Sequence, residues 1–202
     1  MVCLSCHRPT SGRLCTSCTA TLRPAPERVL PGGLRLVAPF THEGVARDLV
    51  HLLKYRGVTF HATLAAEAIA ERMPRLPLVP VPRALSRRLR YGVDPSRILA
   101  AELATRLWVP VLDLLRPRIH MSRRAGRNRA ARLPAFTPRR PISAPVILVD
   151  DVVTTGSTLV AAATALGWEN VAMAVVANSA PVPSLSARDS PQSSRWPLRQ
   201  QS

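Results

Sequence analysis

Lysine, aromatic residues and long apolar runs are all scarce in this chain of 202 residues. Lys54 is the single lysine among 28 basic residues. The phosphate-binding loop of P-loop nucleotide-binding proteins follows the pattern Gly-x-x-x-x-Gly-Lys-Ser/Thr, and the only lysine context, Lys54-Tyr-Arg-Gly57, does not supply it. The sequence therefore excludes the P-loop class of nucleotide-binding proteins.

Membrane and secretion signals are missing as well. No stretch stays apolar over the roughly 20 residues that a membrane-spanning helix needs. The chain begins Met1-Val-Cys3, without the basic and then apolar regions of a secretory signal. We therefore expect a cytoplasmic protein with no membrane partner. Aromatic residues make up 4% of the chain, so stacking surfaces for single-stranded nucleic acid are sparse.

Positive charge is abundant and concentrated in one part of the chain. The formal net charge is +16, and fifteen arginines but only three acidic residues lie between Arg83 and Arg140. Arginine forms paired hydrogen bonds with phosphate oxygens. This distribution indicates a polyanionic ligand or partner, for which a phosphorylated small molecule and single-stranded nucleic acid are both candidates.

Four cysteines form two Cys-x-x-Cys pairs near the N-terminus: Cys3 with Cys6, and Cys15 with Cys18. Two such pairs at this spacing predict one tetrahedral Zn²⁺ held by four thiolates. A closed four-thiolate site has no open position, so the zinc is expected to be structural. Two disulfides are the alternative, which a cytosolic location disfavours. Cys-x-x-Cys-His7 also matches covalent haem attachment, but that reading leaves the second pair unexplained.

The order of apolar patterns predicts an α/β protein with an open parallel sheet flanked by helices and a small N-terminal zinc knuckle. We expect the knuckle over residues 1–22, a connector and hood-like helical segment over 23–77, a core over 78–179 and a disordered tail over 180–202. Residues 116–141 are expected to be a long arginine-rich loop. Strands are predicted over 34–40, 78–82, 111–115, 146–149 and 171–176, and helices over 43–55, 64–73, 95–107 and 159–166.

The segment from Val146 to Leu159 is the most informative in the chain. It predicts a buried strand ending in two carboxylates, Asp150 and Asp151, followed by a turn of small and hydroxyl residues that opens a helix. Carboxylates accept hydrogen bonds from the vicinal hydroxyls of ribose. A Thr/Gly/Ser turn at a helix N-terminus offers backbone N–H groups and hydroxyls to a phosphate. The arrangement suits a phosphorylated sugar.

This segment resembles the 5-phosphoribosyl-1-pyrophosphate (PRPP) binding motif of type I phosphoribosyltransferases. The resemblance implies a type I phosphoribosyltransferase-like core that binds PRPP together with Mg²⁺. It assigns Asp150 and Asp151 as the catalytic pair that contacts the ribose. The PRPP-binding residues that it implies run from that pair through Val152, Val153, Thr154, Thr155, Gly156, Ser157 and Thr158. Arg83, Arg123 and Arg124 are then candidates for binding pyrophosphate.

Further motifs resemble the ComF or GntX-like family, which comprises competence-associated proteins with a phosphoribosyltransferase domain. The resemblance covers about residues 3 to 178. Its elements are the two cysteine pairs, Lys54-Tyr-Arg-Gly57, Val79-Pro-Val-Pro82, the arginine-rich loop from Arg123 to Arg132, and Asp150 to Thr158.

Two departures from the family pattern bear on the second substrate. Gly-Phe-Asn/Asp-Gln of the family becomes Gly92-Val93-Asp94-Pro95 here, and Arg129-x-x-Arg132 replaces Arg-x-x-Asn. The resemblance therefore leaves the acceptor and turnover itself open. One hypothesis is a transferase acting on PRPP. One alternative is a DNA-uptake factor that binds single-stranded DNA or a partner protein, with PRPP regulatory or vestigial. Another is a regulator that senses PRPP without turnover. The superfamily resemblance also leaves a homodimer open.

Overall fold

The computed structural model describes residues 1–83, 92–118 and 136–181. Six strands form one sheet in the order β1-β2-β8-β7-β4, and β3 also pairs with β8. The strands of this sheet are β1 (Arg28–Leu30), β2 (Leu34–Val37), β3 (Phe40–Thr41), β4 (Leu78–Pro80), β7 (Val146–Val153) and β8 (Val171–Ser179). Every pairing is parallel except that of β1 with β2.

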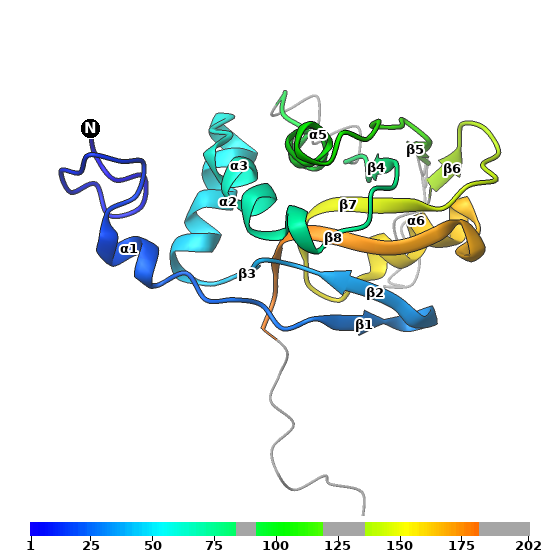
Figure 1. Ribbon diagram of the computed structural model, residues 1–202, viewed down its shortest axis with the longest axis horizontal. Helices are drawn as coiled ribbons and strands as arrows, with labels where there is room; N and C mark the ends of the chain where they lie inside the picture. The colour runs from blue at the N-terminus through cyan, green and yellow to red at the C-terminus, as the bar shows by residue number, and fades with distance from the viewer. Residues whose placement is uncertain (84–91, 119–135, 182–202) are drawn as a thin grey trace, which may run out of the picture.

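The helices cover both faces of this sheet and create two cores. On one face, α2 (Gly44–Arg56), α3 (Phe60–Ile69) and α5 (Pro95–Leu107) pack against the central strands; in Figure 1, α2 and α3 lie to the left of β7 and β8, and α5 lies above β7. On the other face, α6 (Ser157–Leu166) packs with a separate two-stranded sheet of β5 (Leu115–Pro117) and β6 (Phe136–Pro138). The sheet between two apolar layers confirms the predicted α/β class.

The remaining elements are short. The α1 helix (Thr16–Ala20) follows the second cysteine pair, and 3₁₀ turns occur at η1 (Pro31–Gly33), η2 (Ala70–Arg72) and η4 (Trp168–Asn170). Strands β1, β2 and β3 come from the segment 23–77, so the main sheet extends across the expected boundary between connector and core. No helix among the described ranges is long and apolar enough to cross a membrane.

Local sequence signals explain several helix ends. The α2 helix ends at Gly57, which adopts a left-handed conformation (φ 66°) and donates its N–H to the carbonyl of Leu52. This is the glycine cap that the sequence predicts. The α5 helix begins with Pro95 directly after Asp94, as expected from the fixed φ of proline at a first helical position.

The strand predicted over 111–115 is wrong. Val111 forms only a single bridge with Leu78, in which the carbonyl of Leu78 accepts from the N–H of Leu112. Pro80 has no N–H to donate in the next step of that ladder, so the pairing stops there. The chain then turns to the opposite face, where β5 begins at Leu115, the last residue of the predicted strand, and continues into the predicted loop over 116–141.

Other strand boundaries differ from the sequence prediction by a few residues. The predicted strand 34–40 divides into β2 and β3 around Pro39. The predicted strands 146–149 and 171–176 both extend further, to Val153 and Ser179, because they pair with each other over their whole length. The two carboxylates therefore lie within the ladder of β7 rather than after it.

Candidate functional site

The carboxyl ends of the parallel strands bring polar side chains to one edge of the sheet. Asp150 and Asp151 lie near the end of β7, Asn178 near the end of β8, and Arg83 a few residues beyond β4. Ligands in open α/β sheets bind outside these ends. This edge is therefore where the geometry places a candidate site.

Asp151 is held between two cations from distant segments. Its Oδ2 lies 3.1 Å from Lys54 Nζ and 3.2 Å from a guanidinium nitrogen of Arg83. The side chains of Asp151, Lys54 and Arg83 expose 11%, 19% and 15% of their surface, so water screens this ion cluster only weakly. Two positive charges thus converge on one carboxylate oxygen at the sheet edge.

The neighbouring Asp150 has a different environment. Its Oδ1 accepts hydrogen bonds from the hydroxyl of Ser96 at 2.9 Å and from the N–H of Asp151 at 2.8 Å. Burial first, and the nearby negative charge of Asp151 second, raise the pKa of Asp150 to about 7, although both hydrogen bonds and Lys54 act in the opposite direction. Asp150 is therefore harder to ionise than an ordinary aspartate.

A tight turn connects β7 to α6 beside this pair. Gly156 adopts a left-handed conformation (φ 82°) as the residue preceding α6, and a Cβ atom there would lie 2.7 Å from Cδ2 of Leu30. The hydroxyl of Thr155 lies 3.2 Å from that of Ser157 and accepts from the Ser157 N–H at 3.4 Å. The first turn of α6 contains no acidic residue, so its N–H groups face no internal negative charge.

Arg28 attaches the turn to the first strand. Its guanidinium donates to the carbonyl of Thr154 at 3.2 Å and to the hydroxyl of Ser179 at 3.1 Å. A positive charge consequently lies next to the N-terminus of α6. Both features favour an anionic group at the turn.

A buried polar network fixes the N-terminal end of α2 against β8. Asn178 donates to the carbonyl of Ala46 at 2.9 Å, and its amide also contacts His61 Nε2 at 3.0 Å and His42 Nδ1 at 3.2 Å. Burial lowers the pKa of His61 to about 4 and is also the main cause of the lowered pKa of His42. Both imidazoles are therefore neutral at physiological pH, and the network acts as an uncharged support for α2.

A pocket of about 210 Å³ adjoins the ion cluster on the side of Arg83. Three more arginines line it, Arg97, Arg116 and Arg139, over an apolar floor that includes Pro80. Asp94 and Asp113 also line it, and Asp113 pairs with Arg97 at 3.1 Å and with Arg139 at 3.5 Å, so four arginines face two acidic residues. The pocket therefore favours an anionic group next to the Asp151 cluster.

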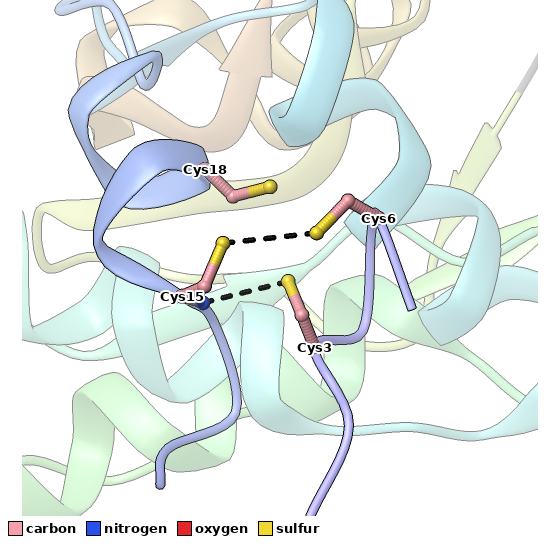
Figure 2. A group of neighbouring side chains, drawn as sticks. All are labelled: Cys3, Cys6, Cys15 and Cys18. Carbon is pink, nitrogen blue, oxygen red and sulfur yellow. Dashed lines mark hydrogen bonds between the residues drawn. The ribbon is translucent and has the colours of Figure 1, made fainter. Parts of the chain in front are cut away.

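The four cysteines converge at the N-terminus, as the sequence predicts. Their Sγ atoms all lie within 4.8 Å of one another, and Figure 2 shows the four side chains directed toward a common centre. The Sγ atoms of Cys6 and Cys15 are 3.7 Å apart. Four thiolates at Zn–S distances of about 2.3 Å would be separated by about 3.8 Å, so the set fits a tetrahedral Zn²⁺.

Backbone groups further favour thiolates in this cluster. Backbone N–H groups, that of Cys6 first and that of Cys15 second, lower the pKa of Cys3 to about 6, and the Cys15 N–H donates to Sγ of Cys3 at 3.4 Å. Burial and the neighbouring sulfurs raise the pKa of Cys18 to about 12. The four thiols are free of disulfide bonds, so they are available to a metal. His7 is not part of the cluster, which gives no support to haem attachment.

The predicted site residues have different outcomes. Asp150, Asp151 and the turn from Thr154 to Thr158 lie together at the sheet edge, whereas the side chain of Val153 is buried in the apolar layer. Arg83 reaches the carboxylate pair. Arg123 and Arg124 lie outside the described residues, as does the predicted disordered tail beyond residue 181.

Three contributors were missed in the sequence: Lys54, Ser96 and Arg28. Lys54 was placed in the motif Lys54-Tyr-Arg-Gly57, but its contact with the carboxylate pair was not predicted. That motif, and its being the single lysine in an arginine-rich chain, are the sequence signals that could have marked it. Ser96 and Arg28 carry no comparable local signal, because their contacts depend on how distant segments pack.

Neither the models of protein families nor the curated protein sequences include a match to this chain. Among solved structures, similarity is found to the purine phosphoribosyltransferase of Pyrococcus horikoshii, with 19% identity and a TM-score of 0.35 over 62% of this chain and 78% of that one.

Proposed function

We propose that the chain binds PRPP with Mg²⁺ at the carboxylate pair and the following turn, and transfers the phosphoribosyl group to an acceptor with release of pyrophosphate. The observation that carries the proposal is the juxtaposition of Asp150 and Asp151 with the Gly156 turn at one sheet edge. An anion-binding turn and a hydroxyl-binding carboxylate pair within one strand–turn–helix unit match the two ends of a 5-phosphoribosyl group.

Each part of the ligand has a counterpart in this arrangement. The N–H groups at the start of α6 and the charge of Arg28 suit the 5′-phosphate. The carboxylates suit the two ribose hydroxyls, which would donate to them. Arg83 and the arginine-lined pocket suit the diphosphate. Mg²⁺ bound with PRPP would offset diphosphate charge and prefers oxygen ligands of this kind.

The chain's contribution to transfer would be to bind and orient. Displacement of pyrophosphate at the anomeric carbon develops positive charge on the sugar ring and negative charge on the leaving group. A carboxylate beneath the ribose and cations around the diphosphate stabilise both charges. Holding the two reactants in line supplies a further large part of the rate acceleration.

We also propose that the four-cysteine cluster binds structural Zn²⁺. Its distances fit that ion, and the first 22 residues bury little apolar surface of their own. Zinc binding contributes on the order of 10–16 kcal/mol to the folding of small zinc peptides, which is enough to order such a segment.

The competence-factor alternative has weaker support from the described residues. Binding of single-stranded DNA requires unpaired cations alternating with aromatic rings. The arginine-lined pocket has no aromatic residue among the described residues that line it. The geometry thus favours a small phosphorylated ligand over a nucleic acid strand at this edge.

Calorimetric titration of the purified protein with PRPP and Mg²⁺ tests the proposal. We expect saturable binding to the unaltered chain and loss of that binding in Asp150→Asn. Glu71→Gln, an equivalent acid-to-amide change on an exposed side chain, should bind as the unaltered chain does. Pyrophosphate release in the presence of an acceptor panel then tests transfer. Absence of PRPP binding, together with oligonucleotide binding that weakens steeply as salt is raised, would contradict the proposal.

A further inference from the structure

The ion cluster around Asp151 has more positive than negative charge in the ligand-free protein. Lys54 and Arg83 contribute two cations, and Asp151 is the anion that both contact. Buried cations need partners, because transfer of an isolated charge out of water is costly. The carboxylate of Asp151 satisfies both only in part, and burial keeps the neighbouring Asp150 only partly ionised near pH 7, so positive charge remains available to a ligand at this point.

Stability alone does not account for this arrangement. A buried ion pair rarely stabilises a protein more than apolar residues of similar volume would. Lys54 is also the one basic position where the chain uses lysine instead of arginine. An ammonium group is a compact charge with three donors, which can leave a carboxylate for a phosphate oxygen by rotation about the side-chain bonds.

The position of Lys54 on α2 permits such an exchange without moving the helix. The residue lies in the last turn of α2, next to the cap at Gly57. The N-terminal part of the same helix is fixed to β8, because Asn178 donates to the carbonyl of Ala46. The helix therefore presents Lys54 from a fixed base, and only its side chain needs to move.

We propose that Lys54 is the residue that selects ligands carrying a diphosphate. In the ligand-free protein, Asp151 takes the place of the diphosphate as the counter-ion of Lys54 and Arg83. When the ligand binds, both cations move to diphosphate oxygens, and Asp151 is released to accept hydrogen bonds from the ribose. This inference rests on the proposed function and names the group within it that distinguishes PRPP from other sugar phosphates.

Two ligands that share a phosphorylated ribose should differ in how strongly their binding depends on Lys54. Ribose 5-phosphate offers the 5′-phosphate and ring hydroxyls but has no diphosphate to receive Lys54. Its affinity should therefore depend on the Gly156 turn and on the carboxylates, but little on Lys54. The affinity for PRPP should depend on the turn, the carboxylates and Lys54.

Titration of both ligands into three variants tests this separation. We expect Lys54→Met to weaken PRPP binding roughly tenfold to hundredfold, the usual loss for a charge-assisted hydrogen bond, and to change ribose 5-phosphate binding by less than about threefold. Lys54→Arg keeps the charge and should restore part of the PRPP affinity. Arg56→Met, an equivalent change at an exposed position on the same helix, is the control and should change neither affinity.

The unaltered chain provides a second readout that does not depend on how the variants fold. Labelling of lysine with ¹³C at the ε position gives one side-chain resonance, because Lys54 is the single lysine. Saturation with PRPP should shift this resonance clearly, and saturation with ribose 5-phosphate should shift it much less.

The outcomes distinguish this inference from the proposed function. Binding of both ligands with an equal loss in Lys54→Met, or a lysine resonance that PRPP leaves unchanged, would overturn the role of Lys54 and leave the PRPP site standing. Failure of both ligands to bind the unaltered chain would overturn the proposed function and this inference together.

Discussion

The thiol cluster and the carboxylate site are assembled in opposite ways. The cluster takes four identical side chains from one short segment, Cys3 to Cys18. The carboxylate site takes Arg28, Lys54, Arg83 and Ser96 from separate segments and adds them to β7. The first depends on local spacing and a metal, whereas the second depends on the packing of the whole sheet. A substitution should therefore have a confined effect in one region and a distributed effect in the other.

The largest expected effect is the loss of metal from the thiol cluster. Cys6→Ser removes one of four thiolates, so we expect zinc content to fall from about one ion per chain to near zero and the first 22 residues to lose order. Metal analysis and amide exchange would measure this. Ser17→Ala, at an exposed position between the second pair of cysteines, is the control.

Because the thiol cluster is built from one short segment, we expect the loss of order to be confined to that segment. The amide protection of β7 and β8 should be the same in Cys6→Ser as in the unaltered chain. Loss of protection throughout the sheet would show that the two regions fold as one unit.

The next largest effect is expected at Gly156. Gly156→Ala places a side chain at φ 82° and brings its Cβ within 2.7 Å of buried Leu30. We expect a loss of about 2–4 kcal/mol in the free energy of unfolding, from left-handed strain and overpacking together. Gly33→Ala has the same strain, at φ 79°, but open space around the added atom. A smaller loss there, in urea titrations, isolates the packing part.

The two carboxylates should respond to amide substitution in opposite directions. Asp151→Asn removes the counter-ion of Lys54 and Arg83, so we expect it to lower the free energy of unfolding by about 2 kcal/mol. Asp150→Asn removes a carboxyl group that ionises with difficulty, so we expect it to raise stability by about 1 kcal/mol at pH 8. Urea titrations of both variants at pH 8 would show the contrast.

The pH dependence of stability tests whether the raised pKa of Asp150 explains the effect of Asp150→Asn. The folded-state pKa of Asp150 is about 7, above its ordinary value of 3.8. The folded protein therefore binds more protons than the unfolded chain between these values, and this contribution to stability is present below about pH 4 and is lost as pH rises to about 7. Asp150→Asn should remove that part of the slope. Identical slopes in the variant and the unaltered chain would contradict the assignment.

The smallest effect concerns the contact between the two regions. Ser5 donates a hydrogen bond to Asp48 of α2 at 3.2 Å, at an exposed position. Ser5→Ala should change the free energy of unfolding by less than about 1 kcal/mol, because water replaces exposed hydrogen bonds. PRPP affinity and zinc content should both stay as they are. A change in PRPP affinity would mean that the thiol cluster communicates with the sheet edge.

The difference between local and long-range assembly also explains how far the sequence could predict this structure. The cysteine spacing, the Gly57 cap and the Asp150–Thr158 segment are local patterns, and the structure places their residues together as the patterns require. The contact of Lys54 with Asp151 joins residues almost a hundred positions apart, and no local pattern encodes it.

Errors in the predicted strands have the same origin. Val111 to Leu115 has the composition of a strand, but whether it pairs depends on its neighbour, and Pro80 in that neighbour lacks the N–H to continue the ladder. Short strands such as β1 and β6 were missed because their three residues show no alternation. Whether such a segment forms a strand depends on its pairing partner, and only the complete fold determines which partner it has.

Strand β4 has one more consequence, for association between molecules. It is the last strand on its side of the main sheet, and its outer edge is covered at Leu78 by residues 110–112. Beyond that point Pro80 and Pro82 offer no N–H groups to an incoming chain. An edge strand protected in this way resists pairing with a strand of another molecule, which would otherwise extend the sheet into a fibril or a continuous dimer. If two copies of this protein associate, that margin of the sheet is therefore a poor place for them to join.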